Sequence, residues 1–390
     1  MKAHRGQNML SPVIPEVASW IAGTPGTMSL GQGVAWFPPP PEVGEAVREA
    51  LDTAGINSYG PWTGSPALVE AIQRKLKSEN RLDLDGSQIV VTTGANMAFC
   101  HAIQAIGDPG DEIILPSPYY FNHHMAITMA GMKPVAVPTR PNHQLDLDAL
   151  VAAVGPKTRA IVTVSPNNPS GAVYPQSDLA AVNSLCAENG LFHISDEAYE
   201  YFVWDGYPHF SPGALTGAKR HTISLFSLSK SYGFAGWRIG YMVVPDSIKE
   251  SLRKIQDTQL ICPPGLTQVA ATAALNRGRE WPDSFKSGLT KARDTLDAIL
   301  TSAPGIQVAP SEGAFYFLAE FPLEESPENL VQYMIRHHRI AALPATTFGA
   351  RGCTIRFSYG AIEPDKLDES AGRLSDAIGD ILSSPRKMNE

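Results

Sequence analysis

The segment Ser227–Arg238, with the sequence SLSKSYGFAGWR, follows directly on the apolar run Thr222–Phe226. Such a run predicts a buried strand, and Lys230 then stands just beyond its end. A lysine in that position loses solvation, which disfavours the ammonium and leaves an amine able to form a Schiff base with a carbonyl. Ser227 and Arg238 offer groups suited to a nearby anion. Most lysines are solvated surface charges, so the rest of the chain has to show whether Lys230 differs.

Short apolar runs alternate with helical patterns on both sides of this segment. A helix is predicted from Ser65-Pro66, because Leu68, Ile72 and Leu76 recur one turn apart on one face. Strands are predicted over residues 88–92, 112–115, 133–137, 159–164, 191–194, 222–226 and 239–244. This alternation is typical of an α/β domain with a mostly parallel central sheet flanked by helices. Ligands bind beyond the carboxyl ends of such strands, so catalytic groups are expected just after them.

The pattern changes beyond residue 280, and 390 residues exceed the length at which a single core stops growing. A long helix is predicted over 283–300, short strands near 315–318 and 354–357, and a last helix from Glu363. These elements indicate a smaller α+β domain. We therefore predict a large ligand-binding domain over residues 45–285 and a small C-terminal domain over 286–390. Residues 1–44 are predicted to form an N-terminal segment that packs with the small domain.

Charge and composition exclude several classes of protein. With 31 Lys and Arg against 39 Asp and Glu, the net charge of −8 argues against nucleic acid or an anionic membrane as the main partner. No stretch approaches the roughly 18 apolar residues of a membrane span, and the N-terminus lacks the apolar stretch of a signal peptide. The four cysteines are widely spaced and suggest neither a disulfide framework nor a zinc site. A cytoplasmic protein without a metal is expected.

Two acidic residues follow the predicted strand 191–194, and Tyr199 comes three residues after the first of them, Asp196. Asp196 could serve as a helix cap or salt-bridge partner. Alternatively, its carboxylate could pair with a protonated ring nitrogen, which a pyridine cofactor needs in order to act as an electron sink. Asn168, in the turn Ser165–Gly171, is either a turn former or a rigidly held amide donor. Both alternatives remain open for each residue.

Arg356 lies in the apolar predicted strand 354–357, and a buried guanidinium must be paired. Its partner is either an internal acid or, in a bidentate clamp, the carboxylate of a substrate. Gly94-Ala95-Asn96 lies where a predicted strand meets a helix, and the free N–H groups there suit a phosphate. The only GxG, Gly31-Gln32-Gly33, has Trp36 where a dinucleotide fingerprint needs a third glycine. The pairs His123-His124 and His337-His338 lack metal-binding spacing and are interpreted as structural.

In their order, these residues resemble the pyridoxal-phosphate-dependent aminotransferases of class I/II, which have the aspartate-aminotransferase-like fold type I. SLSKSYGFAGWRIGY is similar to the family's cofactor-lysine motif, SPNNPSG to its NNPTG turn and ISDEAYEYF to its buried acid. The segments TTGANMAF, SPYYFNH, SYGPWTGSPALVEAI, GAFYF and TIRFSYG resemble further motifs, so the likeness covers nearly the whole chain. It implies a transaminase that moves the amino group of an L-amino acid to a 2-oxo acid through a Schiff base of pyridoxal phosphate. A β-eliminating lyase or cyclase on the same fold is the alternative.

The resemblance also implies a role for each matching residue. The catalytic residues would be Lys230, Asp196 and Tyr199, with Lys230 holding the cofactor first and moving the proton at the substrate Cα afterwards. The cofactor would be bound by Gly94, Ala95, Asn96, Tyr120, Asn168, Asp196, Tyr199, Ser227, Lys230 and Arg238, with Tyr59 coming from the partner subunit of a homodimer. Tyr120 is preferred over Tyr119 on register alone. The substrate would be bound by Gly33, Trp36, Asn168 and Arg356.

Trp36 and the loop Leu260–Pro264 are apolar in regions where relatives line the substrate pocket. We therefore hypothesise an aromatic or otherwise apolar amino donor, although both segments could simply pack against the core. A serine acyl-transfer enzyme would explain the S-x-x-K spacing of Ser227 and Lys230, but its companion motifs are missing. A non-catalytic DNA-binding regulator would need a helix-turn-helix segment, for which this acidic chain has no room.

Overall fold

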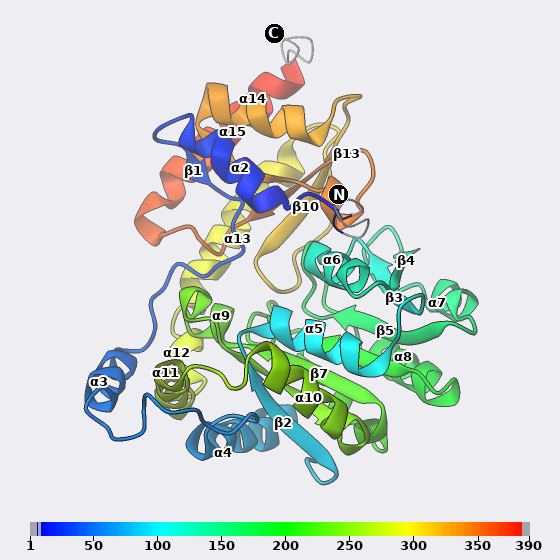
Figure 1. Ribbon diagram of the computed structural model, residues 1–390. Helices are drawn as coiled ribbons and strands as arrows, with labels where there is room; N and C mark the ends of the chain where they lie inside the picture. The colour runs from blue at the N-terminus through cyan, green and yellow to red at the C-terminus, as the bar shows by residue number, and fades with distance from the viewer. Residues whose placement is uncertain (1–5, 7–8, 384–390) are drawn as a thin grey trace.

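The computed structural model describes residue 6 and residues 9–383, which form two lobes (Figure 1). The lower lobe in Figure 1 is built on a seven-stranded sheet of order β2-β8-β7-β6-β5-β3-β4. Its strands are β2 Ser87–Thr92, β3 Glu112–Ser117, β4 Lys133–Pro138, β5 Thr158–Val164, β6 Phe192–Asp196, β7 Thr222–Ser227 and β8 Gly240–Pro245. All seven predicted strands are present and the mostly parallel α/β fold is confirmed. Strand β8 alone runs opposite to the other six strands of this sheet, which the alternation did not predict.

Apolar side chains point alternately to the two faces of this sheet, as the two-residue period of a strand requires. In β2, Val90 packs in a core with α5 Ala95–Ile106, α6 Phe121–Met129 and α10 Lys249–Gln259. Its neighbours Ile89 and Val91 pack on the other face with α4 Pro66–Lys75 and α11 Gly265–Arg277. A further core lies under α7 Leu147–Ala153 and α8 Gln176–Glu188. With both faces covered, the open edge left for ligands is the one at the strands' carboxyl ends.

The upper lobe in Figure 1 holds a four-stranded antiparallel sheet of order β12-β13-β10-β9. These strands are β9 Gln307–Val308, β10 Tyr316–Phe321, β12 Leu343–Pro344 and β13 Cys353–Ser358, with helices α13 Lys286–Ser302, α14 Pro327–His338 and α15 Leu367–Ser383. Strand β1 Met28–Ser29 pairs with β11 Ile340–Ala341, and α2 Val13–Ala22 shares the same apolar core. The early segment therefore contacts the small lobe directly.

The division into domains at residues 44 and 285 stays a prediction, and the position of one helix concerns the boundary at residue 44. Residue 44 lies inside α3 Pro41–Ala50, a helix that the sequence interpretation did not include. This helix packs on α11, and Arg277 of α11 lies 3.7 Å from Glu42 of α3. A boundary before Pro41 would keep α3 whole. The second predicted boundary falls where the short helix α12 Glu280–Asp283 gives way to α13.

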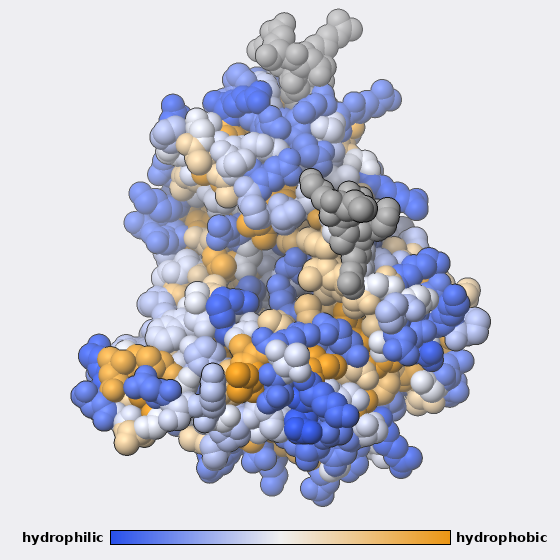
Figure 2. Space-filling model, viewed as in Figure 1, coloured by the Kyte–Doolittle hydropathy of each residue, from blue (hydrophilic) through white to orange (hydrophobic). Residues whose placement is uncertain are grey.

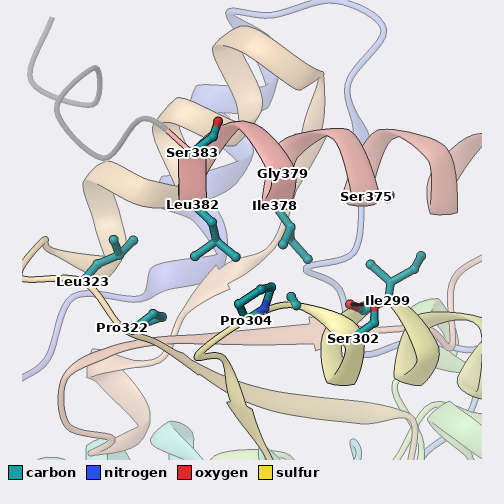
Figure 3. A pocket seen from close by; sticks show the side chains of 11 residues that line it. Ile299, Ser302, Pro304, Pro322, Leu323, Ser375, Ile378, Gly379, Leu382 and Ser383 are labelled. Carbon is teal, nitrogen blue, oxygen red and sulfur yellow. Dashed lines mark hydrogen bonds between the residues drawn. The ribbon is translucent and has the colours of Figure 1, made fainter.

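Most of the surface in Figure 2 is hydrophilic, with one hydrophobic patch over α3 and another over the region of α5 and α10. A hollow of about 570 Å³ opens between α13 and α15 on the small lobe, with apolar walls that include Ile299, Ile378 and Leu382 (Figure 3). It shares no residue with the site described below. Among residues 9–383, no helix combines the length and apolar character that crossing a bilayer requires.

Candidate active site

A cavity of about 170 Å³ lies where strands β5, β6 and β7 end. The last residues of these strands, Val164, Asp196 and Ser227, all line it. The other residues that line it are Ala95, Asn96, Tyr120, Asn168, Ala198, Tyr199, Ser229, Lys230 and Arg238. The fold thus brings together at one sheet edge residues that are up to 143 positions apart, between Ala95 and Arg238. Nearly all the predicted cofactor-binding residues are among them.

One end of the cavity is built to hold an anion. Helix α5 begins at Ala95, so its free N–H groups and the positive end of its dipole face the cavity. Gly94 precedes it with φ +89°, and a Cβ at Gly94 would lie 2.8 Å from Nη2 of Arg238. Glycine is therefore required both for the backbone turn and for the arginine's approach. The Ser227 hydroxyl, which accepts a hydrogen bond from the Ser229 N–H at 3.2 Å, completes this end.

Lys230 lies on the short helix α9 Leu228–Ser231, just past β7. Desolvation lowers the pKa of its amine from 10.5 to about 8, with smaller contributions from the positive charges of Arg238 and Arg356. The carboxylate of Asp196 opposes this shift. Roughly a tenth of the amine is then neutral at pH 7, far more than for a solvated lysine, and the neutral amine is the nucleophile.

The depressed pKa of Lys230 predicts how stability depends on pH in the protein without cofactor. Below pH 8 Lys230 is protonated in both states, and the folded state carries a desolvated ammonium. Between pH 8 and 10.5 Lys230 keeps its proton only in the unfolded state, so the free energy of unfolding rises with pH over this range. Lys230→Met should therefore be more stable than the wild type at pH 7, by at most about 3 kcal/mol because the cavity leaves the amine partly accessible. The gap should close as the pH approaches 10.5. Urea unfolding at several pH values measures it, and a gap independent of pH would contradict the prediction.

His123, interpreted as structural from the sequence, contacts the predicted site residue Asp196. His123 lies on α6, 2% exposed, with its Nε2 atom 3.1 Å from Oδ2 of Asp196. Its ring also stacks on Phe99 at 4.0 Å between centroids. On the other side, the Ala198 N–H donates to Oδ1 of Asp196 at 3.1 Å. The carboxylate is thus held from two sides, whereas the adjacent His124 stacks on Tyr119 and stays outside the cavity.

Asn168 connects the two sides of the site. Its Nδ2 donates to the Tyr199 hydroxyl at 3.4 Å, while its Oδ1 accepts from Nη1 of Arg356 at 2.8 Å. Burial and the nearby Tyr316 hydroxyl raise the pKa of Tyr199 well above 10, so Tyr199 is a neutral donor at physiological pH. Tyr199 and Asn168 can therefore both donate hydrogen bonds into the cavity.

Arg356, 1% exposed on β13, has a guanidinium held between two aromatic rings. Its Cζ lies 4.4 Å from the ring centroid of Tyr316 and 4.9 Å from that of Phe348. Its Nη2 donates to the Gly31 carbonyl, but Nε has no partner among the described residues. No acid pairs with this arginine in the described part of the chain, so the internal salt bridge considered from the sequence is not found there. A substrate carboxylate would supply the missing acceptor.

These residues fit pyridoxal phosphate. The α5 N-terminus, Ser227 and Arg238 suit its phosphate, Asp196 suits a protonated ring nitrogen, and Tyr199 and Asn168 suit the ring oxygen. Tyr120, rather than Tyr119, lines the cavity, and its hydroxyl accepts a hydrogen bond from Asn122 at 2.8 Å. The buried Nε of Arg356, which has no partner among the described residues, is a polar group that a ligand would complete.

Five predicted residues lie outside the cavity lining: Gly94 and Arg356, whose contacts are described above, and Gly33, Trp36 and Tyr59. Gly33 is close to the site, because a Cβ there would lie 1.9 Å from the Tyr316 hydroxyl. Trp36 packs edge-on against Phe285, at 5.2 Å between centroids, and is not among the described residues that line the cavity, so its role in substrate binding stays a prediction. Tyr59 is 81% exposed on the large lobe and does not line its own chain's cavity.

Glu197, Glu200 and His209 offer ligand atoms within 4.8 Å of one another, the grouping a metal ion would need. Each of them is already engaged: Glu197 accepts from Ser211 and pairs with His209 at 2.9 Å. Glu200 accepts from Lys75 and from Asn80. The group, of which only Glu197 is fully buried, forms a hydrogen-bonded network and carries no metal assignment.

The chain matches known proteins along most of its length. Residues 25–374 match the family model of "Aminotransferase class I and II". An aromatic aminotransferase of Arabidopsis thaliana is 33% identical over 95% of this chain and 94% of its own length. A probable aspartate/prephenate aminotransferase of Aquifex aeolicus is 34% identical over 91% of each chain. The solved structure of the aspartate aminotransferase from Thermus thermophilus with maleate aligns with a TM-score of 0.89 at 31% identity, covering 97% of this chain and 99% of the other.

Proposed function

Because the chain belongs to the class I and II aminotransferases, and is therefore a pyridoxal-phosphate-dependent aminotransferase, we propose that the cavity at Lys230 is its active site. The observation that carries this is the convergence, at one sheet edge, of a desolvated amine, a held carboxylate and an anion-binding helix end. Each of these groups follows a different strand. Chance assembly of all three around one cavity is improbable.

The bound cofactor supplies an electron sink that stabilises negative charge at the substrate Cα. Lys230 would hold the cofactor through Nζ and, once released, move the proton at Cα, for which its pKa of about 8 is suited. Asp196 would keep the ring nitrogen protonated, because an opposite charge nearby favours the charged form of both groups. Arg356 would bind the substrate α-carboxylate and, with Asn168, orient Cα towards Lys230.

We also propose an aromatic or apolar amino donor. Among the described residues that line the cavity, only Lys230 and Arg238 are cations, and both are assigned to the cofactor. Arg356 is assigned to the α-carboxylate, so none of these three described cations remains for a second carboxylate on the substrate. Aromatic rings, those of Tyr120, Tyr199 and Tyr316, surround the position instead. The Arabidopsis relative is named for aromatic substrates and the Aquifex relative for aspartate and prephenate, so the relatives alone do not decide.

The donor proposal predicts that phenylalanine is used with a kcat/KM at least about 10-fold above that of aspartate, the cost of one unpaired buried carboxylate. Both should be measured with the same 2-oxo acid in excess. Alanine serves as the control, since it shares the α-carboxylate and lacks both side chains. Equal kcat/KM values for phenylalanine and aspartate would contradict the proposed donor class, and the assignment of Lys230 would be unaffected.

We propose that the protein acts as a homodimer in which Tyr59 completes the partner's site. Tyr59 is exposed next to the loop at Cys262, since the Gly60 N–H lies 3.3 Å from the Cys262 sulfur. Leu51 and Ile261 are also exposed in these two segments, at 57% and 39%. Large exposed apolar side chains gathered in this way indicate an interaction surface. A symmetric dimer through it would cover these residues in both copies.

Shared sites predict complementation between two defective variants. Lys230→Ala and Tyr59→Ala are each expected to be impaired alone. In a mixed dimer, one site has Lys230 of one chain and Tyr59 of the other, so about a quarter of all sites in an equal mixture become intact. To measure this complementation, the two variants are unfolded and refolded together, and their activity is compared with that of the two variants mixed in the folded state. Activity no higher than the average of the two variants would contradict the sharing of Tyr59.

We further propose a reducing compartment, the cytoplasm, as the place of action. All four cysteines are free, and the two buried ones, Cys186 and Cys353, lie in separate cores. Unpaired cysteines are usual in proteins of reducing compartments.

A further inference from the structure

Tyr316 is a buried tyrosine that belongs to the small lobe but reaches the large one. It opens β10, is 0% exposed, and its hydroxyl lies 2.6 Å from the hydroxyl of Tyr199. Burial raises the pKa of Tyr316 to about 12, so both tyrosines are neutral at physiological pH. The GAFYF segment alone does not show which side chain approaches Tyr199, so the contact of Tyr316 is visible only in the structure.

The protons in this cluster can be counted. A tyrosine hydroxyl donates one hydrogen bond and can accept two. Tyr199 already accepts from Nδ2 of Asn168 at 3.4 Å. If Tyr316 donates as well, both lone pairs of Tyr199 are used and its only proton is left to point to an acceptor in the cavity. If Tyr316 had no hydroxyl, the Tyr199 proton would lose this constraint.

Tyr316 is itself held rigidly. Its ring lies under the guanidinium of Arg356 at 4.4 Å, and the N-terminal segment closes over its hydroxyl at Gly33. Any side chain at Gly33 would have to displace that hydroxyl, since even a Cβ would come within 1.9 Å of it. Tyr316 therefore contacts both Arg356, which is assigned to the substrate carboxylate, and Tyr199, which is assigned to the cofactor ring oxygen.

We propose that Tyr316 is a positioning residue that orients the Tyr199 hydroxyl towards the cofactor ring oxygen and holds the Arg356 guanidinium flat for the substrate carboxylate. This inference rests on the proposed function of the cavity. The two proposed roles can be tested separately, because the Tyr316 hydroxyl orients Tyr199 whereas the Tyr316 ring holds the guanidinium of Arg356. Phenylalanine at 316 removes the first contribution, and leucine removes both.

The test is the pH titration of the visible absorption of the protein loaded with pyridoxal phosphate. A hydrogen bond donated to the ring oxygen stabilises its negative charge, so Tyr316→Phe should move the titration midpoint upwards by roughly half to one pH unit. Its KM for the amino acid should stay within about twofold of the wild type, because the ring remains. Tyr316→Leu should show the same spectral shift and a KM raised roughly 3- to 30-fold by the lost ring contact.

Tyr359→Phe is the matched control. Tyr359 is equally buried in the small lobe, but its hydroxyl lies 2.9 Å from that of Ser311, away from Tyr199. It should leave the midpoint unchanged. In a Tyr199→Phe background, Tyr316→Phe should add no further shift, which separates an effect through Tyr199 from a general disturbance. The double variant also tests the inference if a single variant is unstable.

Two results would overturn the inference differently. If wild type and Tyr359→Phe bind the cofactor and titrate, while Tyr316→Phe titrates at the wild-type midpoint, the positioning role is wrong and the proposed function stands. A shift that persists undiminished in the Tyr199→Phe background would also overturn it. If the wild type shows no visible band with added cofactor, the proposed function fails, and the role of Tyr316 fails with it.

Discussion

Lys230→Ala is expected to lower kcat by roughly 10⁴-fold, because a single positioned amine is assigned both the covalent hold on the cofactor and the proton transfer at Cα. The variant should still bind pyridoxal phosphate, since the α5 N-terminus, Ser227 and Arg238 remain in place. The change is therefore expected in kcat and in the visible spectrum, with the fold intact. Steady-state kinetics and the absorption spectrum of the loaded protein measure the two effects.

Lys230→Arg is the matched control for charge. It keeps a cation beside Asp196 but offers no nucleophilic amine, because arginine stays protonated in proteins. The same loss of activity is expected as for alanine. If either variant kept more than about a tenth of the wild-type kcat, the amine of Lys230 would not be the group that moves the proton.

Asp196→Asn is the second change with a large expected effect. Asparagine keeps the size of the side chain and can still accept from the Ala198 N–H, but it carries no negative charge to hold a ring proton. A charge partner within a few ångströms shifts a pKa by about 1 to 3 units, so kcat at neutral pH should fall about 10- to 1000-fold. The loss should shrink at lower pH, where the ring nitrogen is protonated without help.

The pH profile of kcat checks this second prediction, and Asp85→Asn is its control. Asp85 is exposed on the large lobe, so its loss changes the net charge equally without touching the cavity. A profile for Asp196→Asn parallel to that of the wild type would mean that the carboxylate serves only to anchor His123 and the backbone.

The strands and most of the cavity residues could be predicted from the sequence because their signals are local. The apolar run of β7 and the residues just after it, Ser227 and Lys230, are adjacent in the chain. Asp196 ends β6 in the same way. Parallel strands then bring such ends together at one edge of the sheet, so local patterns were enough to predict which residues meet.

Contacts between distant segments could not be predicted in this way. His123 belongs to a pair of adjacent histidines, and only the direction of α6 decides that His123 meets Asp196 while His124 meets Tyr119. For Trp36 the sequence left open whether the ring lines the substrate pocket or packs, and only the structure shows its contact with Phe285. The antiparallel direction of β8 depends on the path of the chain between lobes, for which the apolar pattern carries no signal.

The most direct test of the account is to find the residue that carries the cofactor. The protein loaded with pyridoxal phosphate would be treated with borohydride, which fixes a C=N linkage as a stable amine, then digested and examined by mass spectrometry. We expect the cofactor's mass on the peptide that contains Lys230, and none on this peptide when a saturating amino donor is added before borohydride. Modification of a different lysine, or none at all in a protein that binds the cofactor, would contradict it.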